Sequence, residues 1–303
     1  MSTPIPPGWD LSSVPSLGGQ RFLVTGGTSG LGLATARALT SRGADVTITA
    51  RDPHKGAAVV AAGLARQVIE MDLADLASVH RAAQSVPGPF DVVILNAGVM
   101  WTPWQLTGDG FELQVGTNHL GHFAFAGLIR DRIARRLVSV SSLSHRVGTF
   151  GAGTIEEIRR RCEGRATYDA RRAYGDSKLA NLLFSAELER RRVAQGWPFV
   201  AVTAHPGWTR TNLFDTAAAH GVIARVASLS TKVLAQSADC GALPTLCAAT
   251  WPGLVGGEFV GPRGPGELRG APKLVRASAK ARDADLAQNL WRVSEELTGV
   301  RWV

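Results

Sequence analysis

Cysteine and long apolar runs are scarce in this chain of 303 residues. The three cysteines, Cys162, Cys240 and Cys247, have the spacing of neither a zinc site nor a disulfide framework. This usage is typical of a reducing compartment, so we expect a cytoplasmic protein without a bound metal. No apolar run reaches the roughly 18 residues of a membrane span, and no charged start followed by an apolar core indicates a secretory signal. We therefore expect no stable membrane insertion.

Tyrosine and lysine are also rare: the chain has only two tyrosines and five lysines. Tyr174 and Lys178 nevertheless lie four positions apart, which places them on one face of a helix. A fixed ammonium beside a phenol favours the phenolate and moves its pKa from roughly 10 toward the working range. The pair therefore indicates acid–base chemistry by the tyrosine. Tyr168 has Arg172 at the same offset, and arginine is not equivalent to lysine in such a role.

What the chain has in abundance is the alternation of short apolar runs with helical patterns, in a composition that is 45% hydrophobic. This alternation predicts an α/β fold, a single Rossmann-type doubly wound parallel sheet flanked by helices. We expect strands at 21–25, 44–50, 67–71 and 91–95, a helix at 33–40 and a last helix near 283–297. We expect one domain over 1–303, with an irregular arm at 1–17 that Trp9 anchors, a core at 18–262 and a C-terminal extension at 263–303.

Several glycines lie between the first expected strand and the first expected helix. Gly26, Gly30 and Gly32 permit positive φ and let backbone N–H groups approach a pyrophosphate at the helix N-terminus. Their spacing is G-x3-G-x-G rather than the G-x-G-x-x-G of many dinucleotide folds. Because the turn follows a strand and precedes a helix, it predicts dinucleotide binding.

The end of the second strand predicts the cofactor preference. In nucleotide-binding βαβ units this position meets the adenosine ribose, where a basic residue pairs with a 2′-phosphate and an acidic one binds the 2′-hydroxyl. Arg51 is the first loop residue, which favours NADP(H) over NAD(H). Asp52 follows directly, and the alternative is that Asp52 faces the ribose.

Further motifs follow in a fixed order: Asp72-Leu73, Asn96-Ala97-Gly98, Asn118, Ser142, the Tyr174–Lys178 pair and the segment 205–212. Over about residues 18–262 they resemble the short-chain dehydrogenase/reductase family, and most closely its branch of retinol dehydrogenases and protochlorophyllide reductase relatives. The resemblance implies catalytic roles for Asn118, Ser142, Tyr174 and Lys178. It implies cofactor contacts at Gly26, Thr28, Ser29, Gly30, Leu31, Gly32, Asp72, Leu73, Asn96, Ala97, Gly98, Tyr174, Lys178, Pro206, Gly207, Thr209 and Thr211.

In that family Tyr174 would exchange a proton with the substrate oxygen, and Ser142 would hydrogen-bond the same oxygen. Lys178 would lower the Tyr174 pKa and hold the nicotinamide ribose, and Asn118 would anchor a water that leads from Lys178 to solvent. The alignment favours Ser142 over Ser141 as the catalytic serine. His205 is expected as a packed side chain, with contact to cofactor or substrate as the alternative.

The chain departs from the family between Ser142 and Tyr174, where an enlarged loop at 146–172 contains an expected helix at 155–161. Downstream, apolar residues at helical spacing within 213–234 predict a lid helix, which favours a lipophilic or aromatic substrate. Trp101, Trp104 and Trp208 lie in loops at the predicted carboxyl edge of the sheet, where they would line an aromatic pocket or serve packing.

These features predict an enzyme that transfers hydride between a nicotinamide and a carbonyl or alcohol of a small molecule. The alternatives are an NADP(H)-binding regulator without turnover and a reductase of an activated C=C or C=N bond. The net charge is +8, but the arginines are spread along the chain and no nucleic-acid motif is present, so we expect no nucleic-acid partner. A homodimer or homotetramer is compatible with the sequence.

Overall fold

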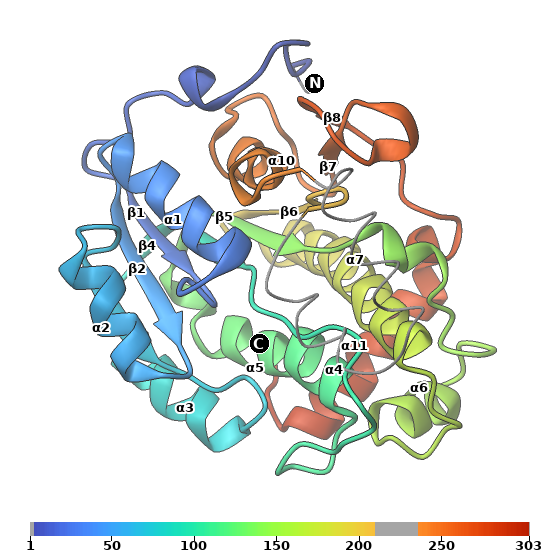
Figure 1. Cartoon of the computed structure of the whole chain (residues 1–303). Coiled ribbons are helices and arrows are strands. Elements are labelled where there is room, and N and C mark those ends of the chain that lie inside the picture. Colours follow the sequence, from blue (N-terminus) through green and yellow to red (C-terminus); the bar gives the residue numbers. More distant parts are fainter. Residues whose placement is uncertain (1–2, 210–235, 303) are drawn as a thin grey trace, which may run out of the picture.

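The computed structural model describes residues 3–209 and 236–302, and within these ranges it contains one eight-stranded sheet (Figure 1). The strand order is β3-β2-β1-β4-β5-β6-β7-β8, parallel except for the β7–β8 pair. The strands are β1 (Arg21–Val24), β2 (Asp45–Ala50), β3 (Gln67–Glu70), β4 (Phe90–Leu95), β5 (Ile133–Val140), β6 (Val200–Ala204), β7 (Phe259–Pro262) and β8 (Pro272–Leu274). This arrangement confirms the predicted α/β class, and the reversal of strand order between β1 and β4 is the doubly wound topology.

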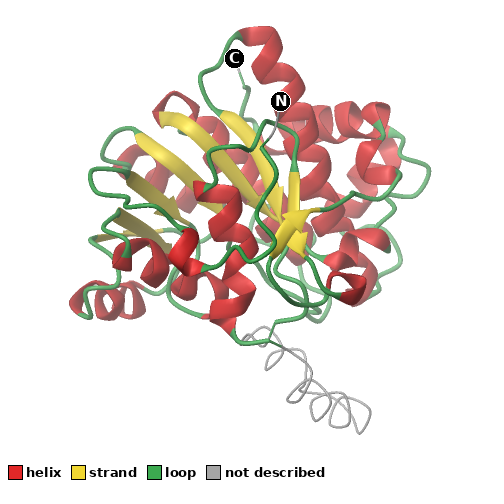
Figure 2. Ribbon diagram, turned by 90° about the horizontal axis from the view of Figure 1, so that it is seen from above, coloured by secondary structure: helices red, strands yellow, loops and turns green. Residues whose placement is uncertain are grey.

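Helices cover both faces of the sheet (Figure 2). On one face α1 (Gly30–Ser41), α2 (Pro53–Ala61) and α10 (Ala238–Thr250) share a core with alternate strand residues such as Phe22 and Val24. On the other face α3 (Leu76–Ser85), α5 (Gly121–Leu128) and α7 (Ala170–Gln195) pack on Leu23 and its neighbours. Successive strand side chains point to opposite faces, so a strand covered on both faces is apolar throughout.

The expected element boundaries agree with the structure to within one or two residues in most cases. The first helix begins earlier than expected, at Gly30 rather than residue 33, because the glycine turn leads directly into it. The last helix, α11 (Ala284–Thr298), lies one residue from the prediction. The expected lid helix within 213–234 lies outside the described residues.

Both ends of the described chain contribute to the packing. Trp9 lies in the N-terminal arm just before η1 (Leu11–Ser13) and is 1% exposed. It belongs to the core that contains residues of α1 and α10, so it anchors the arm, as predicted. In the C-terminal part, β8 extends the sheet, and α11 carries Trp291 into an aromatic cluster with Phe123, Phe184 and Trp302. The expectation of a single domain stays a prediction, which this shared sheet and core support.

The enlarged loop between Ser142 and Tyr174 is packed against α7. It contains η4 (Leu143–Arg146) and α6 (Ile155–Cys162), the helix expected at 155–161. Phe150, Ile158 and Cys162 are buried in a third core with Leu179 and Leu183 of α7. Arg161 forms an ion pair at 2.9 Å with Asp176, a residue between Tyr174 and Lys178. The packing of the loop is therefore coupled to the helix that carries the predicted acid–base pair.

Candidate active site

The predicted site residues gather at the edge of the sheet formed by the carboxyl ends of the parallel strands. The glycine turn follows β1, Arg51 follows β2, and Asp72 lies two residues after β3. The Asn96–Gly98 segment, Ser142 and Pro206 follow β4, β5 and β6, respectively. Because these strands are parallel neighbours, their carboxyl ends meet at one edge, where ligands bind in open α/β sheets.

The glycine turn has the backbone geometry that a dinucleotide pyrophosphate requires. Gly26 and Gly30 have φ of +68° and +52°. A Cβ on Gly32 would lie 2.2 Å from the Gly26 carbonyl oxygen, so a side chain there would fill the turn. Ser29 begins α1 without capping it through its side chain, and the first turn contains no acidic residue. The first N–H groups of α1 thus suit an anion, with Thr28 and Leu31 half-buried beside them.

The Asn96-Ala97-Gly98 segment is held against this turn by Thr25. The Thr25 hydroxyl accepts hydrogen bonds from the N–H groups of Asn96 at 2.9 Å and Ala97 at 3.0 Å, and the Asn96 amide donates to the Thr25 carbonyl at 2.9 Å. A Cβ on Gly98 would lie 2.9 Å from Asn118 Oδ1 and 3.6 Å from Lys178 Nζ. Gly98 therefore lies directly beside the predicted catalytic residues.

At the adenosine end, Arg51 is exposed, whereas the Asp52 carboxylate caps α2 and accepts the N–H groups of His54 at 2.9 Å and Lys55 at 3.2 Å. These hydrogen bonds lower the Asp52 pKa, the one from Lys55 most. Next along the edge, Asp72 is half-buried, and its carboxylate accepts the Ala74 N–H at 2.9 Å. Leu73 is buried. Asp52 is thus engaged in a helix cap, while the structure leaves Arg51 exposed at the strand end.

Beyond β6, Pro206 and Gly207 are half-buried, Thr209 is buried, and Thr211 lies outside the described residues. Gly207 has a φ of +70° and approaches the Leu268 carbonyl so closely that a Cβ would lie 2.4 Å from it. His205 is buried against Phe259, so it is packed, as expected. Its Nδ1 accepts the Gly207 N–H at 3.2 Å, so Nε2 is the nitrogen that donates to Glu267, also at 3.2 Å.

Tyr174, Lys178 and Ser142 lie together where β5 meets α7. Lys178 Nζ is 5.7 Å from the centroid of the Tyr174 ring and donates to the Val140 carbonyl at 3.1 Å. Burial lowers the Lys178 pKa to about 8. Burial also raises the Tyr174 pKa to about 12, while a hydrogen bond with Ser142 acts in the lowering direction. The prediction of a lowered phenol pKa is therefore wrong for this structure, because desolvation outweighs the hydrogen bond from Ser142.

The two adjacent serines differ in what their hydroxyls contact. Ser141 is buried, and its hydroxyl donates to the Lys178 carbonyl at 2.8 Å. Ser142 is half-buried, and its hydroxyl accepts the Ser144 N–H at 3.2 Å and hydrogen-bonds the Tyr174 phenol. The contact with the phenol, which Ser141 does not make, supports Ser142 as the serine that faces a substrate.

Asn118 lies in a short π-helical stretch, Gly116–Leu120, that leads into α5. Its side-chain amide donates to the Val99 carbonyl and the Ser177 hydroxyl, both at 2.9 Å, and its Oδ1 accepts the Val99 N–H at 2.8 Å. Isolated π-helical turns are frequent at functional sites. These contacts tie the Asn118 side chain both to the loop after β4 and to α7.

The sequence motifs do not identify His122, whose ring lies between Thr25 and Asn118. His122 Nδ1 donates to the Asn118 carbonyl at 3.0 Å, and its Nε2 lies 2.8 Å from the Thr25 hydroxyl. Since a carbonyl only accepts, Nδ1 carries the proton and Thr25 donates to Nε2. Burial lowers the His122 pKa to about 4, so the ring is neutral. This ring connects the cofactor turn to Asn118, a link whose only sequence signal is its i+4 offset from Asn118.

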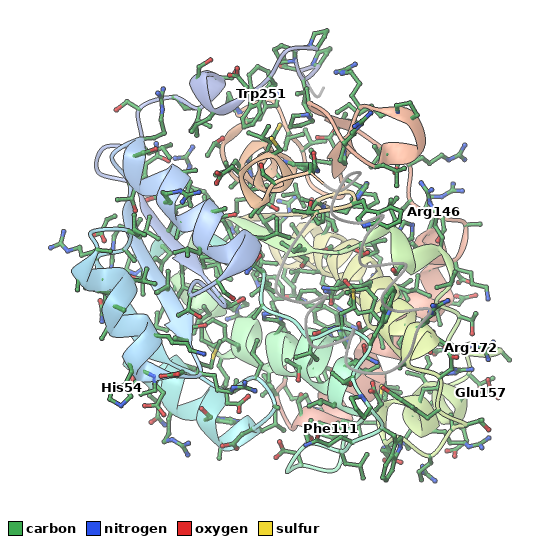
Figure 3. The ribbon with its side chains drawn as sticks, viewed as in Figure 1. His54, Phe111, Arg146, Glu157, Arg172 and Trp251 are labelled. Carbon is green, nitrogen blue, oxygen red and sulfur yellow. The ribbon has the colours of Figure 1, made fainter. Side chains whose placement is uncertain are left out.

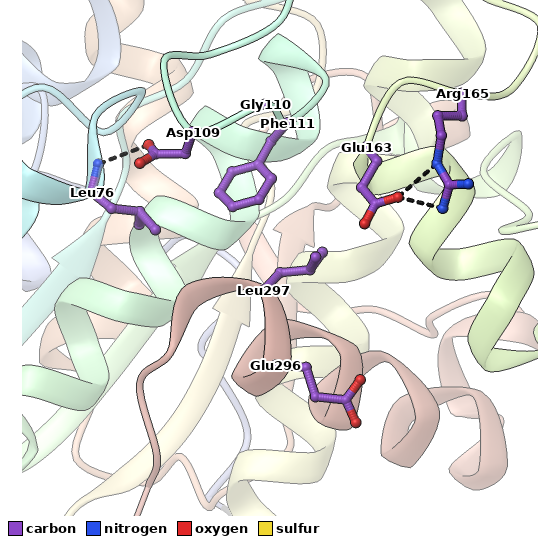
Figure 4. A pocket seen from close by; sticks show the side chains of 8 residues that line it. All are labelled: Leu76, Asp109, Gly110, Phe111, Glu163, Arg165, Glu296 and Leu297. Atoms are coloured by element: carbon purple, nitrogen blue, oxygen red, sulfur yellow. Dashed lines mark hydrogen bonds and ion pairs between the residues drawn. The ribbon is translucent and has the colours of Figure 1, made fainter.

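A separate hollow of about 580 Å³ is lined by residues at the start of α3, after α6 and in α11 (Figure 4). Its lining residues are Leu76, Asp109, Gly110, Phe111, Glu163, Arg165, Glu296 and Leu297. Glu163 is ion-paired with Arg165, and Glu296 with Arg292. None of the lining residues is a predicted site residue, so the hollow does not belong to this site.

A Rossmann-type sheet, a glycine turn before its first helix and a Ser-Tyr-Lys group at the same edge define a nicotinamide-dependent oxidoreductase of alcohols and carbonyls. The family model of the short chain dehydrogenases matches residues 20–153. Retinol dehydrogenase 12 of Homo sapiens is 34% identical over 301 residues, which cover 94% of this chain and 88% of the relative. The chain belongs to the short-chain dehydrogenase/reductase family, in its retinol dehydrogenase-like branch.

Solved structures agree with this assignment. The crystal structure of an uncharacterized protein from Mycobacterium paratuberculosis is 41% identical and superimposes with a TM-score of 0.82, covering 98% of this chain and 99% of that one. A short chain dehydrogenase from Burkholderia cenocepacia, solved in complex with NADP, is 25% identical with a TM-score of 0.59, covering 80% of this chain and 96% of that one. Within the described residues, no helix combines the length and apolar character needed to cross a membrane.

Proposed function

We propose that this oxidoreductase uses NADP(H) to interconvert a carbonyl and an alcohol on a lipophilic or aromatic small molecule, with Tyr174 as the general acid and base. The observation that carries the proposal is the convergence of Tyr174, Ser142 and Lys178 at the carboxyl edge of β5, beside Gly98 of the cofactor side. Asn118, tied to the same edge, completes the proposed catalytic group.

The nicotinamide supplies the hydride when the dinucleotide is bound, and the chain orients the substrate and manages one proton. Ser142 holds the substrate oxygen and stabilises the charge that develops on it. With a pKa raised to about 12, Tyr174 is protonated at neutral pH, which is the form that donates a proton during carbonyl reduction. Lys178, whose pKa is about 8, remains largely charged at pH 7 beside the phenol.

The proposed preference for NADP(H) rests on Arg51. The arginine is exposed at the end of β2, whereas the neighbouring carboxylate of Asp52 is engaged in capping α2. A guanidinium pairs well with a 2′-phosphate, and a carboxylate committed to a helix cap is less suited to bind a ribose hydroxyl. The proposed cofactor contacts are the residues of the glycine turn and of the segments after β3, β4 and β6 that the family resemblance indicates.

The proposed substrate class rests on exposed apolar side chains in the loops that follow β4, β5 and β6. Trp104 and Trp208 are 56% and 38% exposed, in the loops after β4 and β6. Val147, shortly after Ser142, is 58% exposed. A relative of the chain is named for retinol, a lipophilic alcohol. Cytoplasmic location and a homodimeric or homotetrameric state stay predictions.

The test is NADPH oxidation with a panel of aldehydes, ketones and quinones, with NADH in parallel and the products identified. The matched variants are Ser142→Ala and Ser141→Ala. We expect alcohols as products, faster turnover with NADPH, and a fall of at least tenfold for Ser142→Ala beyond any effect of Ser141→Ala. Saturated products from C=C or C=N substrates alone would redirect the proposal to that chemistry. Tight NADPH binding without any turnover would contradict it.

A further inference from the structure

Trp101, in the loop after β4, has a strained backbone. Its φ is +53°, a left-handed conformation that side-chain-bearing residues adopt at a cost of roughly 1 kcal/mol or more. The conformation is held by Gln114, whose Oε1 accepts the Trp101 N–H at 2.7 Å. Gln114 is fully buried. Such strain persists only where the surroundings enforce it, and it concentrates at functional sites.

Gln114 also fixes two other segments relative to this loop. Its side-chain amide donates to the Tyr168 hydroxyl and to the Ala170 carbonyl, both at 3.0 Å. The Tyr168 hydroxyl in turn donates to the Thr102 carbonyl at 2.6 Å. The loop after β4, the end of the enlarged loop and the start of α7 are therefore joined through one buried side chain.

This arrangement places the Trp101 ring where it contacts the cationic side chain of Arg171. The Arg171 guanidinium lies over the Trp101 ring, 5.3 Å from its centroid. A cation–π contact orients a guanidinium without neutralising it, so its donors remain available for an anion. Arg171 is exposed, and among the described residues no carboxylate forms an ion pair with it. The nearby carboxylate of Asp169 is engaged in capping α7, where it accepts the Arg172 N–H at 2.7 Å.

Arg171 shares one face of α7 with the acid–base pair. Arg171, Tyr174 and Lys178 stand at positions i, i+3 and i+7, which align along a helix. Lys178 lies toward the cofactor side, where Gly98 approaches it. Arg171 lies one turn from Tyr174 in the opposite direction. A substrate whose carbonyl meets the Tyr174 phenol and which extends away from the cofactor would therefore reach Arg171.

We propose that Arg171, oriented by Trp101, binds an acidic group, a carboxylate or a phosphate, on an otherwise apolar carbonyl substrate. This inference rests on the proposed function and narrows its substrate class to acidic aldehydes or ketones. The acidic group lies beyond the reacting carbonyl by about one helical turn, since side chains at i and i+3 are separated by roughly 5–6 Å. The enlarged loop contributes by carrying Tyr168, which helps to fix the Trp101 segment.

The test compares binding with turnover for matched ligands. Calorimetry on the NADPH-loaded protein measures the affinity for 4-(hydroxymethyl)benzoate, its methyl ester and 4-(hydroxymethyl)phenyl phosphate, alcohols that the reduced cofactor cannot convert. NADPH oxidation then follows the three corresponding aldehydes. Each measurement is made for the wild type, for Arg171→Ala and for Arg172→Ala. Arg172 is the matched control because it is an exposed arginine of the same helical turn, at the periphery of the molecule (Figure 3).

We expect the wild type to bind at least one acidic alcohol at least tenfold more tightly than the ester, as charge-assisted hydrogen bonds allow. The comparison of carboxylate with phosphate identifies the preferred group. Arg171→Ala should abolish this ratio, and Arg172→Ala should retain it. The inference is overturned if the wild type shows no preference for either acid, or if both variants lose it equally. Turnover of the ester without a preference for the acids would contradict only this inference. Selective binding of an acid without any turnover would contradict only the proposed function.

Discussion

Lys178 Nζ lies 5.7 Å from the centroid of the Tyr174 ring, and both side chains are buried. The ammonium therefore stands beside the phenol at a cost in solvation, which lowers the Lys178 pKa from 10.5 to about 8. An interaction that costs stability and is retained beside a candidate general acid indicates a functional requirement.

Lys178→Met should lose turnover and gain stability. Because the folded-state pKa lies below the unfolded one, the charged form is penalised below about pH 8, by on the order of 3 kcal/mol at neutral pH. The penalty fades as pH rises from about 8 to 10.5, so the gain of the variant should fade over the same range. Urea unfolding without cofactor measures the difference in unfolding free energy between Lys178→Met and the wild type. Lys178→Arg, which keeps a charge, should show no gain; equal or lower stability of Lys178→Met at pH 7 contradicts the interpretation.

Arg51→Ala should raise the KM for NADPH at least tenfold while leaving the KM for NADH within about threefold, because only NADPH carries a 2′-phosphate. Steady-state kinetics with both cofactors measure the split. Arg66→Ala, an exposed arginine that precedes β3 and is ion-paired with Asp45, is the control. If the KM values for both cofactors rise equally, Arg51 does not bind the 2′-phosphate.

The ion pair between Arg161 and Asp176 should matter for stability, since the Asp176 side chain is 2% exposed. Arg161→Ala leaves a buried carboxylate without its cation and should cost about 3 kcal/mol of unfolding free energy at pH 7. Burial already raises the Asp176 pKa, so protonation should relieve part of this cost at lower pH. Denaturant titrations at pH 7 and pH 5 test both statements. The exposed Arg160 offers a control in Arg160→Ala, and a loss below about 1 kcal/mol for Arg161→Ala would count against a structural role.

Acid should destabilise the protein through its buried histidines. Burial lowers the pKa of His119 to about 3, of His122 to about 4 and of His205 to about 3. Between these values and the ordinary 6.5, the unfolded chain binds protons that the folded chain does not, so stability falls as pH drops from about 6.5 toward 4. Each histidine contributes a slope of up to about 1.4 kcal/mol per pH unit.

The effect is isolated by His119→Gln, which should flatten the dependence of the unfolding free energy on pH by about one proton. His54→Gln, which changes an exposed residue at the start of α2 (Figure 3), is the control. An unchanged slope in His119→Gln would mean that this ring is protonated in the folded protein.

The features of the structure that the sequence predicts correctly are those set by short, local patterns of residues. Strands such as Arg21–Val24 and Asp45–Ala50 are short apolar runs, and each is followed by its own helix. The glycine turn and the residues after each strand could be placed at one edge because parallel connections bring all carboxyl ends together. The helix expected at 155–161 is also confirmed as α6, and in the structure the Thr154 side chain caps it.

What could not be read depends on contacts between distant segments. His122 meets Thr25 across 97 positions, and nothing in either local pattern signals the pair. The Tyr174 pKa depends on how completely neighbouring segments exclude water from the phenol, which spacing to Lys178 does not report. The pairing of β8 with β7 rests on three residues that begin with a proline, too few for a strand pattern.

The most direct test of the account is NADPH oxidation by Tyr174→Phe, measured with the best carbonyl substrate, alongside the affinity of the same variant for NADPH. Phenylalanine keeps the ring and removes only the hydroxyl that donates the proton. We predict a fall in kcat of at least a hundredfold, with NADPH affinity within about threefold of the wild type. A variant that retains more than about a tenth of the wild-type rate would show that Tyr174 is not the general acid and would contradict the proposed mechanism.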